Sequence, residues 1–409
     1  MVVESLVRPL VRPFAEFFRR EAAGGIVLLI SAVLALLLAN TEWGPARYFP
    51  AIWDQHLRLA VNGHALDHTL LQWINDGLMT VFFLIVGLEI KREVLDGELA
   101  SPRQAALPIA GALGGMLVPA LLFAAFNHGT PTAGGWGIPM ATDIAFALAV
   151  LQLLGSRIPL GLKVFLTALA IVDDLGAVVV IAGFYTRELH LSFLYLALGT
   201  WGVLLGLNAL GMRHLGWYLP LGAVLWYFML QSGIHATLAG VLLALAIPTH
   251  GSSSRTSDEV ARRSPAQVLE QRLHGVVAFG IMPLFAFANT SLVIDASVQA
   301  KLSSPLALGI LAGLVVGKPL GIGLLSWGTV RLGWAALPTG VTWPQLWGVA
   351  CLGGIGFTMS LLITLLALGE HSAGEDVAKL AILLASLTAG LTGYLVLRAL
   401  PASAATEEA

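Results

Sequence analysis

Residues 160–185 read LGLKVFLTALAIVDDLGAVVVIAGFY, and this stretch decides the class of fold. It is long and apolar enough to cross a bilayer as one helix, which takes about 20 mostly apolar residues. Two adjacent acids, Asp173 and Asp174, nevertheless stand near its middle. Because an ionisable group in the hydrocarbon region is costly and usually marks function, the stretch predicts a membrane-spanning helix that carries a site.

The whole chain has the composition of a membrane protein. Of its 409 residues, 57% are hydrophobic and only 11% are charged, whereas a soluble domain has about 25% charged residues. The net charge of −2 gives no reason to expect a nucleic acid as a partner. The single cysteine, Cys351, excludes an internal disulfide and a cysteine-rich metal site. A lipid bilayer is therefore the expected surrounding.

Hydropathy predicts an all-α integral membrane protein with twelve transmembrane helices in a multi-pass topology. With the N-terminus inside, the external segments hold few basic residues, namely Arg47, Arg58, Arg187, Lys301 and Lys379. Lys318 lies within a span, and the other lysines and arginines are internal. Because positive charge collects on the cytoplasmic side, this bias favours twelve spans with both termini cytoplasmic. The predicted spans lie near residues 22–40, 69–94, 105–127, 134–154, 160–185, 191–211, 215–230, 233–248, 268–290, 304–326, 343–367 and 376–398.

Three segments outside the spans are predicted to form an interfacial helix, a β-hairpin and a flexible linker. Residues 1–21 are predicted to form an interfacial N-terminal helix. Residues 45–66 are predicted to form an external β-hairpin, because Asn62-Gly63 follows a partly alternating run. The edge of such a hairpin can pair with a second copy and give a homodimer, or the segment can be a loop of a monomer. Residues 249–264 are Ser-rich and charged, which predicts a cytoplasmic linker within a single transporter domain, 1–409.

Four charged side chains are predicted to lie inside spans. Asp143 is in the fourth span, Asp173 and Asp174 are in the fifth, and Lys318 is in the tenth. Two close carboxylates repel, so at least one of them should hold a proton or a bare cation near neutral pH, and the two ligands compete. The alternative is that the acids form buried ion pairs that only hold helices together. Since one lysine cannot neutralise three acids, a cation site is favoured.

Two predicted spans contain helix-breaking residues at membrane depth. Residues 134–143 read GGWGIPMATD, and residues 347–358 read WGVACLGGIGFT. Unwound backbone is tolerated there only where it is buried in protein or lines a cavity, and its carbonyls can then coordinate a cation. The broken spans are the middle members of helices 3–5 and 10–12, which start on opposite sides and so predict two inverted-topology repeats. The residues singled out in the breaks are Pro139, Gly354, Gly356 and Thr358.

Eight stretches, in family order over most of the chain, are together similar to the NhaA family of bacterial sodium/proton antiporters. Each alone is a weak signal, but the set is specific. The resemblance implies discontinuous helices 4 and 11 that cross at the midplane of the membrane. Inverted repeats are themselves known from this family, so that expectation is not independent of the resemblance. The stretches are 73–79 (WINDGLM), 86–93 (VGLEIKRE), 141–147 (ATDIAFA), 170–176 (AIVDDLG), 232–240 (SGIHATLAG), 283–289 (PLFAFAN), 317–321 (GKPLG) and 354–360 (GIGFTMS).

The resemblance implies a secondary active transporter of the bacterial inner membrane rather than an enzyme. It would export sodium, and also lithium, in exchange for protons, electrogenically and by alternating access, with no cofactor. The resemblance implies that Asp174 and Asp173 bind the sodium ion and the proton, with Thr142 and Asp143 beside them. It also implies that Lys318 pairs with Asp173 and neutralises the ends of the half-helices.

The resemblance further implies pH regulation through charges near the inner ends of helices. The implied residues are Glu89, Arg92, Glu93, Glu270 and His274, with His235 at the break between the seventh and eighth spans. Without the family, the charges at 89–93 would be read as an ordinary solvated helix end. Position 271 is Gln where the family pattern has a histidine beside the glutamate, so the sequence departs from the family at the pH-sensing group.

Two other functions could use acids within a membrane. A sodium–solute symporter would need a larger pocket, and the sequence offers no added cluster of polar residues for an organic solute. An intramembrane aspartyl protease would place its two aspartates on different helices, one of them in a Gly-x-Gly-Asp setting that is absent here. Cation exchange is therefore the preferred prediction.

Overall fold

The computed structural model describes residues 23–41, 48–61, 64–186, 189–249, 264–369, 372 and 374–401. These residues are mostly helical, and their only sheet is one two-stranded ribbon. Three predicted features lie outside the described residues: the interfacial helix 1–21, the Asn62-Gly63 turn, and nearly all of the linker 249–264.

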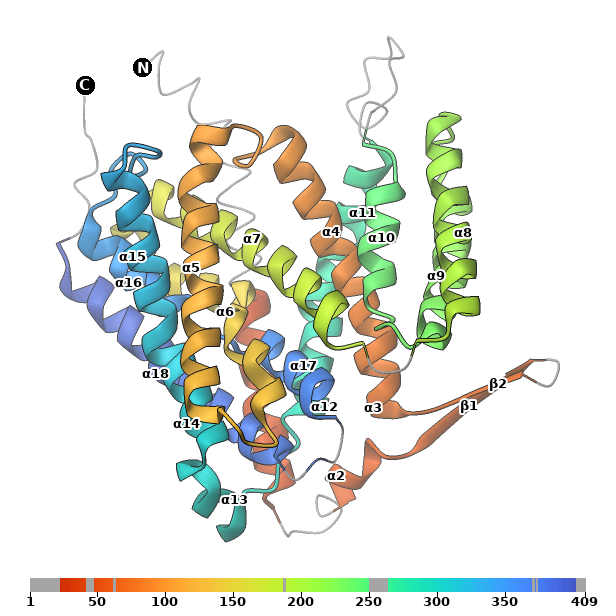
Figure 1. Ribbon diagram of the computed structural model, residues 1–409, viewed down its shortest axis with the longest axis horizontal. Coiled ribbons are helices and arrows are strands. Elements are labelled where there is room, and N and C mark those ends of the chain that lie inside the picture. The colour runs from red at the N-terminus through yellow and green to blue at the C-terminus, as the bar shows by residue number, and fades with distance from the viewer. Residues whose placement is uncertain are drawn as a thin grey trace. The chain divides into compact units, whose positions relative to one another are not determined.

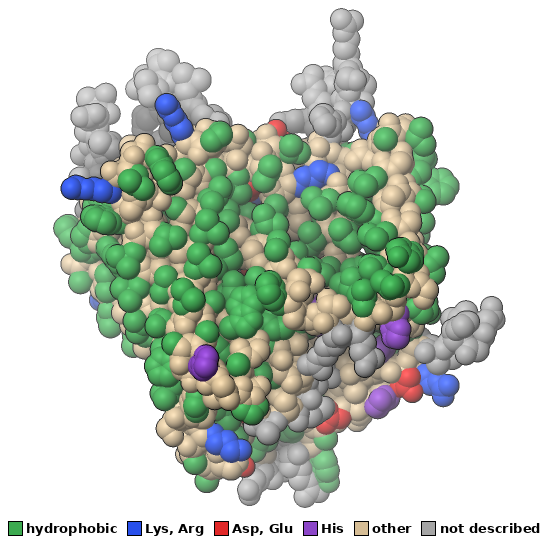
Figure 2. Space-filling model, viewed as in Figure 1, with side chains coloured by type: hydrophobic (Ala, Val, Ile, Leu, Met, Phe, Trp, Pro, Cys, Tyr) green, Lys and Arg blue, Asp and Glu red, His purple; other side chains and the backbone are tan. Residues whose placement is uncertain are grey.

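Within the described residues, eight helices are long and apolar enough to cross a membrane, and a strongly bent pair adds a ninth span. Large apolar side chains remain exposed on these helices, as Leu121, Val179 and Leu387 illustrate. Figure 2 shows such side chains over much of the face in view. Because a soluble protein would not leave so much apolar surface in water, the fold is that of a multi-pass membrane protein. The spans are Leu70–Asp96, Pro102–Asn127, Ala133–Leu153, Leu160–Phe184, Leu191–Ala209, Pro265–Asn289, Pro305–Arg331, Glu375–Ala399 and the pair Trp343–Leu352 with Phe357–Leu368.

Several spans are composed of shorter elements, and Figure 1 labels most of them. The composite spans are α3 (Leu70–Gln72), η2 (Trp73–Leu78) and α4 (Met79–Asp96); η3 (Ala133–Met140) and α6 (Ile144–Leu153); α11 (Pro265–Val276), η6 (Val277–Ile281) and α12 (Met282–Asn289); and α14 (Pro305–Ala312), η8 (Gly313–Gly317) and α15 (Lys318–Arg331). The other spans are α5 (Pro102–Asn127), α7 (Leu160–Phe184), α8 (Leu191–Ala209), α16 (Trp343–Leu352), α17 (Phe357–Leu368) and α18 (Glu375–Ala399). The short connecting helices are α2 (Phe49–Ile52), η4 (Gly155–Arg157), α13 (Ala296–Ala300) and η7 (Lys301–Ser303).

Three of the twelve predicted spans fall short of this test. They correspond to the helix Ala23–Ala39, to α9 (Leu215–Ser232) and to α10 (Leu238–Ala246). The last is short because the chain breaks before it: Gly233 takes a left-handed conformation at φ 81°, and regular helix resumes only at Leu238. The part of the chain that the structure describes thus supports eight or nine spans by length and composition.

The chain forms two compact units, and the boundary runs through α7 between the two aspartates. The first unit comprises Met1–Leu34, Ser101–Asp173 and Leu292–Ala409, and the second comprises Ala35–Ala100 and Asp174–Ser291.

Glycines allow helices of the first unit to pack very closely. The helices α5 and α15 lie side by side (Figure 1). A Cβ atom added to Gly114 would lie 2.0 Å from the carbonyl oxygen of Gly321, and the converse distance is the same. No side chain fits at either position, so close packing accounts for glycine in the run 111–115.

In the second unit, a glycine likewise allows α4 and α10 to pack closely. A Cβ atom on Gly240 would lie 2.2 Å from the carbonyl oxygen of Thr80. At the other end of this contact, the Lys91 ammonium donates to the carbonyl oxygens of Leu245 at 2.7 Å and Ile247 at 2.6 Å. Lys91 therefore satisfies carbonyls at the C-terminal end of α10 that have no partner within the helix.

An antiparallel hairpin precedes α3, as predicted, but with shifted bounds. Its strands are β1 (His56–Val61) and β2 (His64–Thr69), and Leu57 faces His68 in the register. The predicted segment 45–66 ends too early, because Thr69 also caps α3 through a hydrogen bond from the Gln72 N–H, at 3.1 Å. The second strand therefore continues to the start of the helix.

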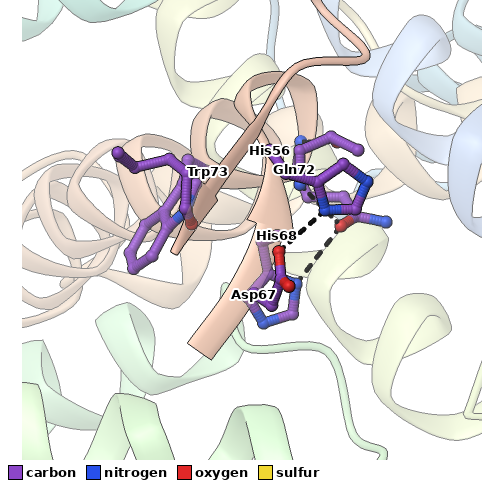
Figure 3. Close-up of polar contacts among 7 residues, drawn as sticks. His56, Asp67, His68, Gln72 and Trp73 are labelled. Atoms are coloured by element: carbon purple, nitrogen blue, oxygen red, sulfur yellow. Dashed lines mark hydrogen bonds and ion pairs between the residues drawn. The ribbon is translucent and has the colours of Figure 1, made fainter. Parts of the chain in front are cut away.

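Side chains fix the base of this hairpin to the helix that follows it (Figure 3). The His56 ring and the Asp67 carboxylate are 2.8 Å apart across the strands, and His68 contacts the Gln72 side chain at 3.2 Å. The indole N–H of Trp73 donates to the Leu57 carbonyl at 3.1 Å. The ribbon is thus held to the start of a span.

Candidate ion-binding site at two broken helices

The fourth predicted span is broken next to its acid. The 3₁₀-helix η3 ends at Met140, and Ala141 is extended, with φ −88° and ψ 149°. Asp143 is also extended, and α6 begins after it at Ile144. Pro139 lies buried just before this break and cannot donate a backbone hydrogen bond. The predicted discontinuity is present.

The eleventh predicted span is broken at its glycines. The helix α16 ends at Leu352 and α17 begins at Phe357, with the two halves bent by 47°. A Cβ atom on Gly354 would lie 2.3 Å from the carbonyl oxygen of Leu314, and one on Gly356 would lie 2.3 Å from the Ser360 hydroxyl. The close neighbour of Gly354 is a backbone carbonyl, so only glycine fits at that position, whereas a side chain at position 356 would first displace the Ser360 hydroxyl.

The two breaks contact each other through hydrogen bonds. The Asp143 N–H donates to the Ile355 carbonyl at 2.7 Å, and the Thr142 hydroxyl donates to the Gly353 carbonyl at 2.9 Å. The Ser360 hydroxyl donates to the Ile138 carbonyl at 2.7 Å. Backbone groups that the breaks release from helices are thus satisfied by the opposite break.

The carboxylate of Asp143 caps two half-helices at once. Its Oδ1 accepts from the Phe146 N–H at 3.0 Å, in the first turn of α6. Its Oδ2 accepts from the Thr358 N–H at 3.1 Å and from the Thr358 hydroxyl at 2.5 Å, in the first turn of α17. Both helix N-termini carry partial positive charge, which stabilises a buried anion between them. Asp143 is only 2% exposed, so these hydrogen bonds and helix dipoles take the place of solvent around its carboxyl group.

A buried ion pair lies beside this cap. The Lys318 ammonium donates to Asp173 Oδ2 at 2.6 Å and to the Thr142 hydroxyl at 2.9 Å. Lys318, Asp173 and Thr142 are all fully buried. The pairing of Lys318 with Asp173, which the family resemblance implied, is therefore present as a contact. Thr142 connects it to the Gly353 carbonyl at the end of α16.

The second oxygen of Asp173 accepts no hydrogen bond from the residues that the structure describes. Its Oδ1 is buried, and no described residue donates to it. A buried acceptor left in this way is costly unless a proton, a cation or a water satisfies it. The next residue on α7, Asp174, is also buried, at 3% exposure, and points about 100° further around the helix. This arrangement can bind a small cation or a proton.

The predicted pH-sensing residues fall into two places within the second unit. Arg92 on α4 forms ion pairs with Glu270 on α11 and, at 3.1 Å, with the neighbouring Glu93. Glu89 and His274 lie about one turn away on the same two helices. His235 lies elsewhere, in the break between α9 and α10, where its ring contacts the Tyr185 carbonyl at 2.9 Å.

Sequence reasoning missed the residues that tie the two breaks together. The carbonyls of Gly353 and Ile355 and the hydroxyl of Ser360 all serve the opposite break. Every residue has a backbone carbonyl, so the residue types alone could not predict which carbonyls accept these hydrogen bonds. Ser360 carried a signal, since a hydroxyl follows the broken GIGFTM run directly, but a mid-helix serine is common enough that the signal was weak.

Buried charges inside interrupted membrane helices define a class of protein, the secondary transporters that bind ions at unwound backbone. A family model described as Na+/H+ antiporter 1 matches residues 15–397. The chain therefore belongs to this antiporter family, whose members are transporters rather than enzymes.

Individual relatives agree with the family model. The chain is 50% identical over 390 residues to a Na(+)/H(+) antiporter NhaA 1 of Klebsiella pneumoniae, covering 95% of this chain and 96% of the relative. It is 52% identical over 384 residues to a Na(+)/H(+) antiporter NhaA 2 of Pseudomonas syringae, covering 94% of each. It is 47% identical over 428 residues to a Na(+)/H(+) antiporter NhaA of Oleidesulfovibrio alaskensis, covering 96% of this chain and 94% of the relative.

Proposed function

We propose that this chain exchanges sodium ions for protons at Asp173 and Asp174. The observation that carries the proposal is a fully buried carboxylate, Asp173, which is paired with Lys318 through one oxygen while the other accepts no hydrogen bond from a described residue. The buried Oδ1 of Asp173 can accept a proton or bind a sodium ion. The two ligands cannot occupy one carboxylate together, so they compete.

The cycle follows from this competition. In the inward-open state, sodium displaces a proton from Asp174, and the broken helices with their partners then expose the site to the other side. An external proton displaces sodium there, and the proton gradient drives export. More protons enter than sodium ions leave, so the exchange is electrogenic, and lithium is carried as well. The names of the relatives, all sodium/proton antiporters, support the choice of ions.

We extend the proposal to the topology of the chain. The helix Ala23–Ala39, α9 and α10 complete twelve spans, with both termini cytoplasmic in a bacterial inner membrane. Helices 3–5 and 10–12 form inverted repeats whose discontinuous members cross near the midplane. Two facts support the repeats: each group has a broken middle member, and both groups, with α7 up to Asp173, belong to the first unit.

Regulation by pH is assigned to the ion network on α4 and α11. Glu270 is 9% exposed and pairs with Arg92, which also pairs with Glu93. A change of charge in this network alters the contact between two helices, so it can bias one conformation over another. Gln271 cannot titrate, so His274 is the histidine of this helix that is available to the network.

The test is sodium-driven proton movement in proteoliposomes. Purified protein is reconstituted with a pH-sensitive dye inside, and sodium, lithium or choline chloride is added outside. We expect dye responses to sodium and lithium, a current in the direction of the excess proton charge, and no response to choline. The absence of any sodium response between about pH 6 and pH 9, the range in which a shifted carboxylate or histidine titrates, contradicts the proposal.

A sodium–solute symporter is the alternative that this assay also separates, because sodium–solute symport moves no proton and takes up sodium only together with an organic solute. One pocket of the described residues, at the base of the hairpin and about 400 Å³ in volume, is lined by tryptophan, glycine and aliphatic side chains. This pocket offers little to recognise a polar solute.

A further inference from the structure

Helix α18 lies against both halves of the broken α16–α17 span. A Cβ atom on Gly348 of α16 would lie 2.6 Å from the Leu397 side chain, and one on Gly393 of α18 would lie 2.5 Å from Leu352. At the break itself, a Cβ atom on Gly354 would lie 3.0 Å from the Cβ of Ala389. The unbroken helix thus runs along the interruption and is placed to hold its two halves in a fixed relation.

The first turn of α17 needs acceptors from outside the helix. The first N–H groups of a helix have no intrahelical partner, and the residue at its N-cap, Gly356, has no side chain to supply one. The Thr358 N–H donates to Asp143, as described above. The Phe357 N–H donates at 3.2 Å to the hydroxyl oxygen of Ser386 on α18.

We propose that Ser386 is a positioning residue for the cation site. Its hydroxyl caps α17 from the neighbouring helix and so holds Thr358 in place against the carboxylate of Asp143. Ser386 touches neither Asp173 nor Lys318 in any described hydrogen bond, so it acts through α17. This inference rests on the proposed exchange function, because its consequence is a change in how tightly the site binds sodium.

The surroundings of Ser386 support a specific role for its hydroxyl. Ser386 is 9% exposed and lies in an otherwise apolar stretch of α18. Thr388, two residues later, is exposed, and its hydroxyl donates to the Leu384 carbonyl of its own helix at 2.7 Å. That is the usual behaviour of a hydroxyl within a helix. Within α18, the Ser386 hydroxyl therefore accepts a hydrogen bond from another helix, whereas the Thr388 hydroxyl donates one to its own helix.

Removal of the Ser386 hydroxyl would leave the Phe357 N–H buried without an acceptor. The first turn of α17 would then become less ordered, and the two hydrogen bonds from Thr358 to Asp143 would weaken. The Phe357 ring also packs edge-on against Phe146 of α6, with ring centroids 5.5 Å apart. A shift of α17 therefore reaches the other half-helix that Asp143 caps, and the geometry around the buried charges changes.

The experiment compares three variants with the full-length wild-type protein in the proteoliposome assay. For Ser386→Ala we expect the half-saturating sodium concentration to rise about two- to tenfold, the factor that corresponds to one net hydrogen bond. The maximal exchange rate should change much less. Ser386→Thr keeps a hydroxyl and should restore the half-saturating concentration toward the wild-type value. The matched control, Thr388→Ala, should leave both parameters unchanged.

Each other outcome has a definite meaning. An unchanged half-saturating concentration in Ser386→Ala overturns the inference, even if the melting temperature falls, since that result describes a purely structural serine. If Ser386→Ala does not fold, Ser386→Cys, with its weak sulfur acceptor, takes its place under the same criteria. If the wild-type protein shows no sodium response, the proposed function fails. A wild-type response with a normal Ser386→Ala means that only the role of Ser386 fails.

Discussion

At the scale of residues, the acids of the candidate site have different surroundings. Asp143 accepts three hydrogen bonds from two helix N-termini, whereas Asp173 has one oxygen on Lys318 and one that accepts no hydrogen bond from the described residues. A carboxylate whose two oxygens both accept hydrogen bonds is suited to stabilise the structure. A carboxylate with one oxygen that accepts no hydrogen bond from the described residues is suited to bind a proton or a cation. We therefore place exchange on the α7 acids and assign Asp143 to the support of the half-helices.

Replacing the second acid of α7 should abolish exchange. Asp174→Asn removes the charge on which proton and sodium compete but keeps the size of the side chain. We expect sodium-driven proton flux to fall by at least about 100-fold, the loss typical for removing a positioned proton-transfer group. Glu98→Gln, a change at an exposed acid, is the control. Near-normal flux in Asp174→Asn would refute the assignment.

Breaking the buried ion pair should destabilise the protein. Lys318→Ala leaves Asp173 buried without its partner, a change that costs about 3–5 kcal/mol in comparable pairs. We expect a lower melting temperature in detergent, with partial recovery in Lys318→Ala combined with Asp173→Asn, because the orphaned charge is then removed. Lys301→Ala, at an exposed lysine, should melt like the wild type. An unchanged melting curve for Lys318→Ala would argue that the pair adds nothing to stability.

At the scale of elements, much of the fold could be predicted from the sequence. The spans followed from runs of apolar residues, and both breaks followed from Pro139 and from the glycines near Gly354. The length of α10 could be predicted only in part: the polar residues 231–233 indicate the break between the seventh and eighth spans, but regular helix resumes at Leu238 rather than at the predicted residue 233. The double cap by Asp143 could not be predicted either, since it depends on where two distant segments meet.

The break in the α16–α17 span depends on glycine. In Gly354→Ala the added Cβ would lie 2.3 Å from the Leu314 carbonyl oxygen, and overpacking of this kind costs about 1–3 kcal/mol. We expect loss of thermal stability together with loss of exchange. The control is Gly328→Ala on α15, where an added Cβ would meet no atom within 4 Å. Equal behaviour of the two variants would show that the break tolerates a side chain.

The ion network between α4 and α11 should set the pH response. Glu270→Gln removes the carboxylate that pairs with Arg92 while keeping the side-chain shape. We expect the pH for half-maximal exchange to move by about one to two units, since a hydrogen bond between charged groups contributes roughly 1.5–3 kcal/mol and one pH unit corresponds to about 1.4 kcal/mol. Arg272→Gln, at an exposed position of the same helix, should keep the wild-type profile. A profile for Glu270→Gln that coincides with the wild type would remove this network from pH sensing.

At the scale of the whole molecule, the hairpin is the element that we expect to join two copies. It is a two-stranded ribbon, and the edge of such a ribbon can pair with another strand. Replacing residues 57–67 by a short glycine–serine loop should convert a dimer into a monomer in detergent, measured by light scattering. Exchange by the shortened protein should persist, because the candidate site lies on other elements. A shortened protein that remains dimeric would place the dimer contact elsewhere.

We propose, above all, that sodium and a proton compete for the α7 acids. The most direct measurement is proton release when sodium is added to the purified protein in weakly buffered detergent solution, with choline chloride as the control salt. We predict that sodium releases protons in proportion to the sites it fills, and that Asp174→Asn releases none. Sodium that binds, as heat in a calorimeter would show, without any release of protons would contradict the account.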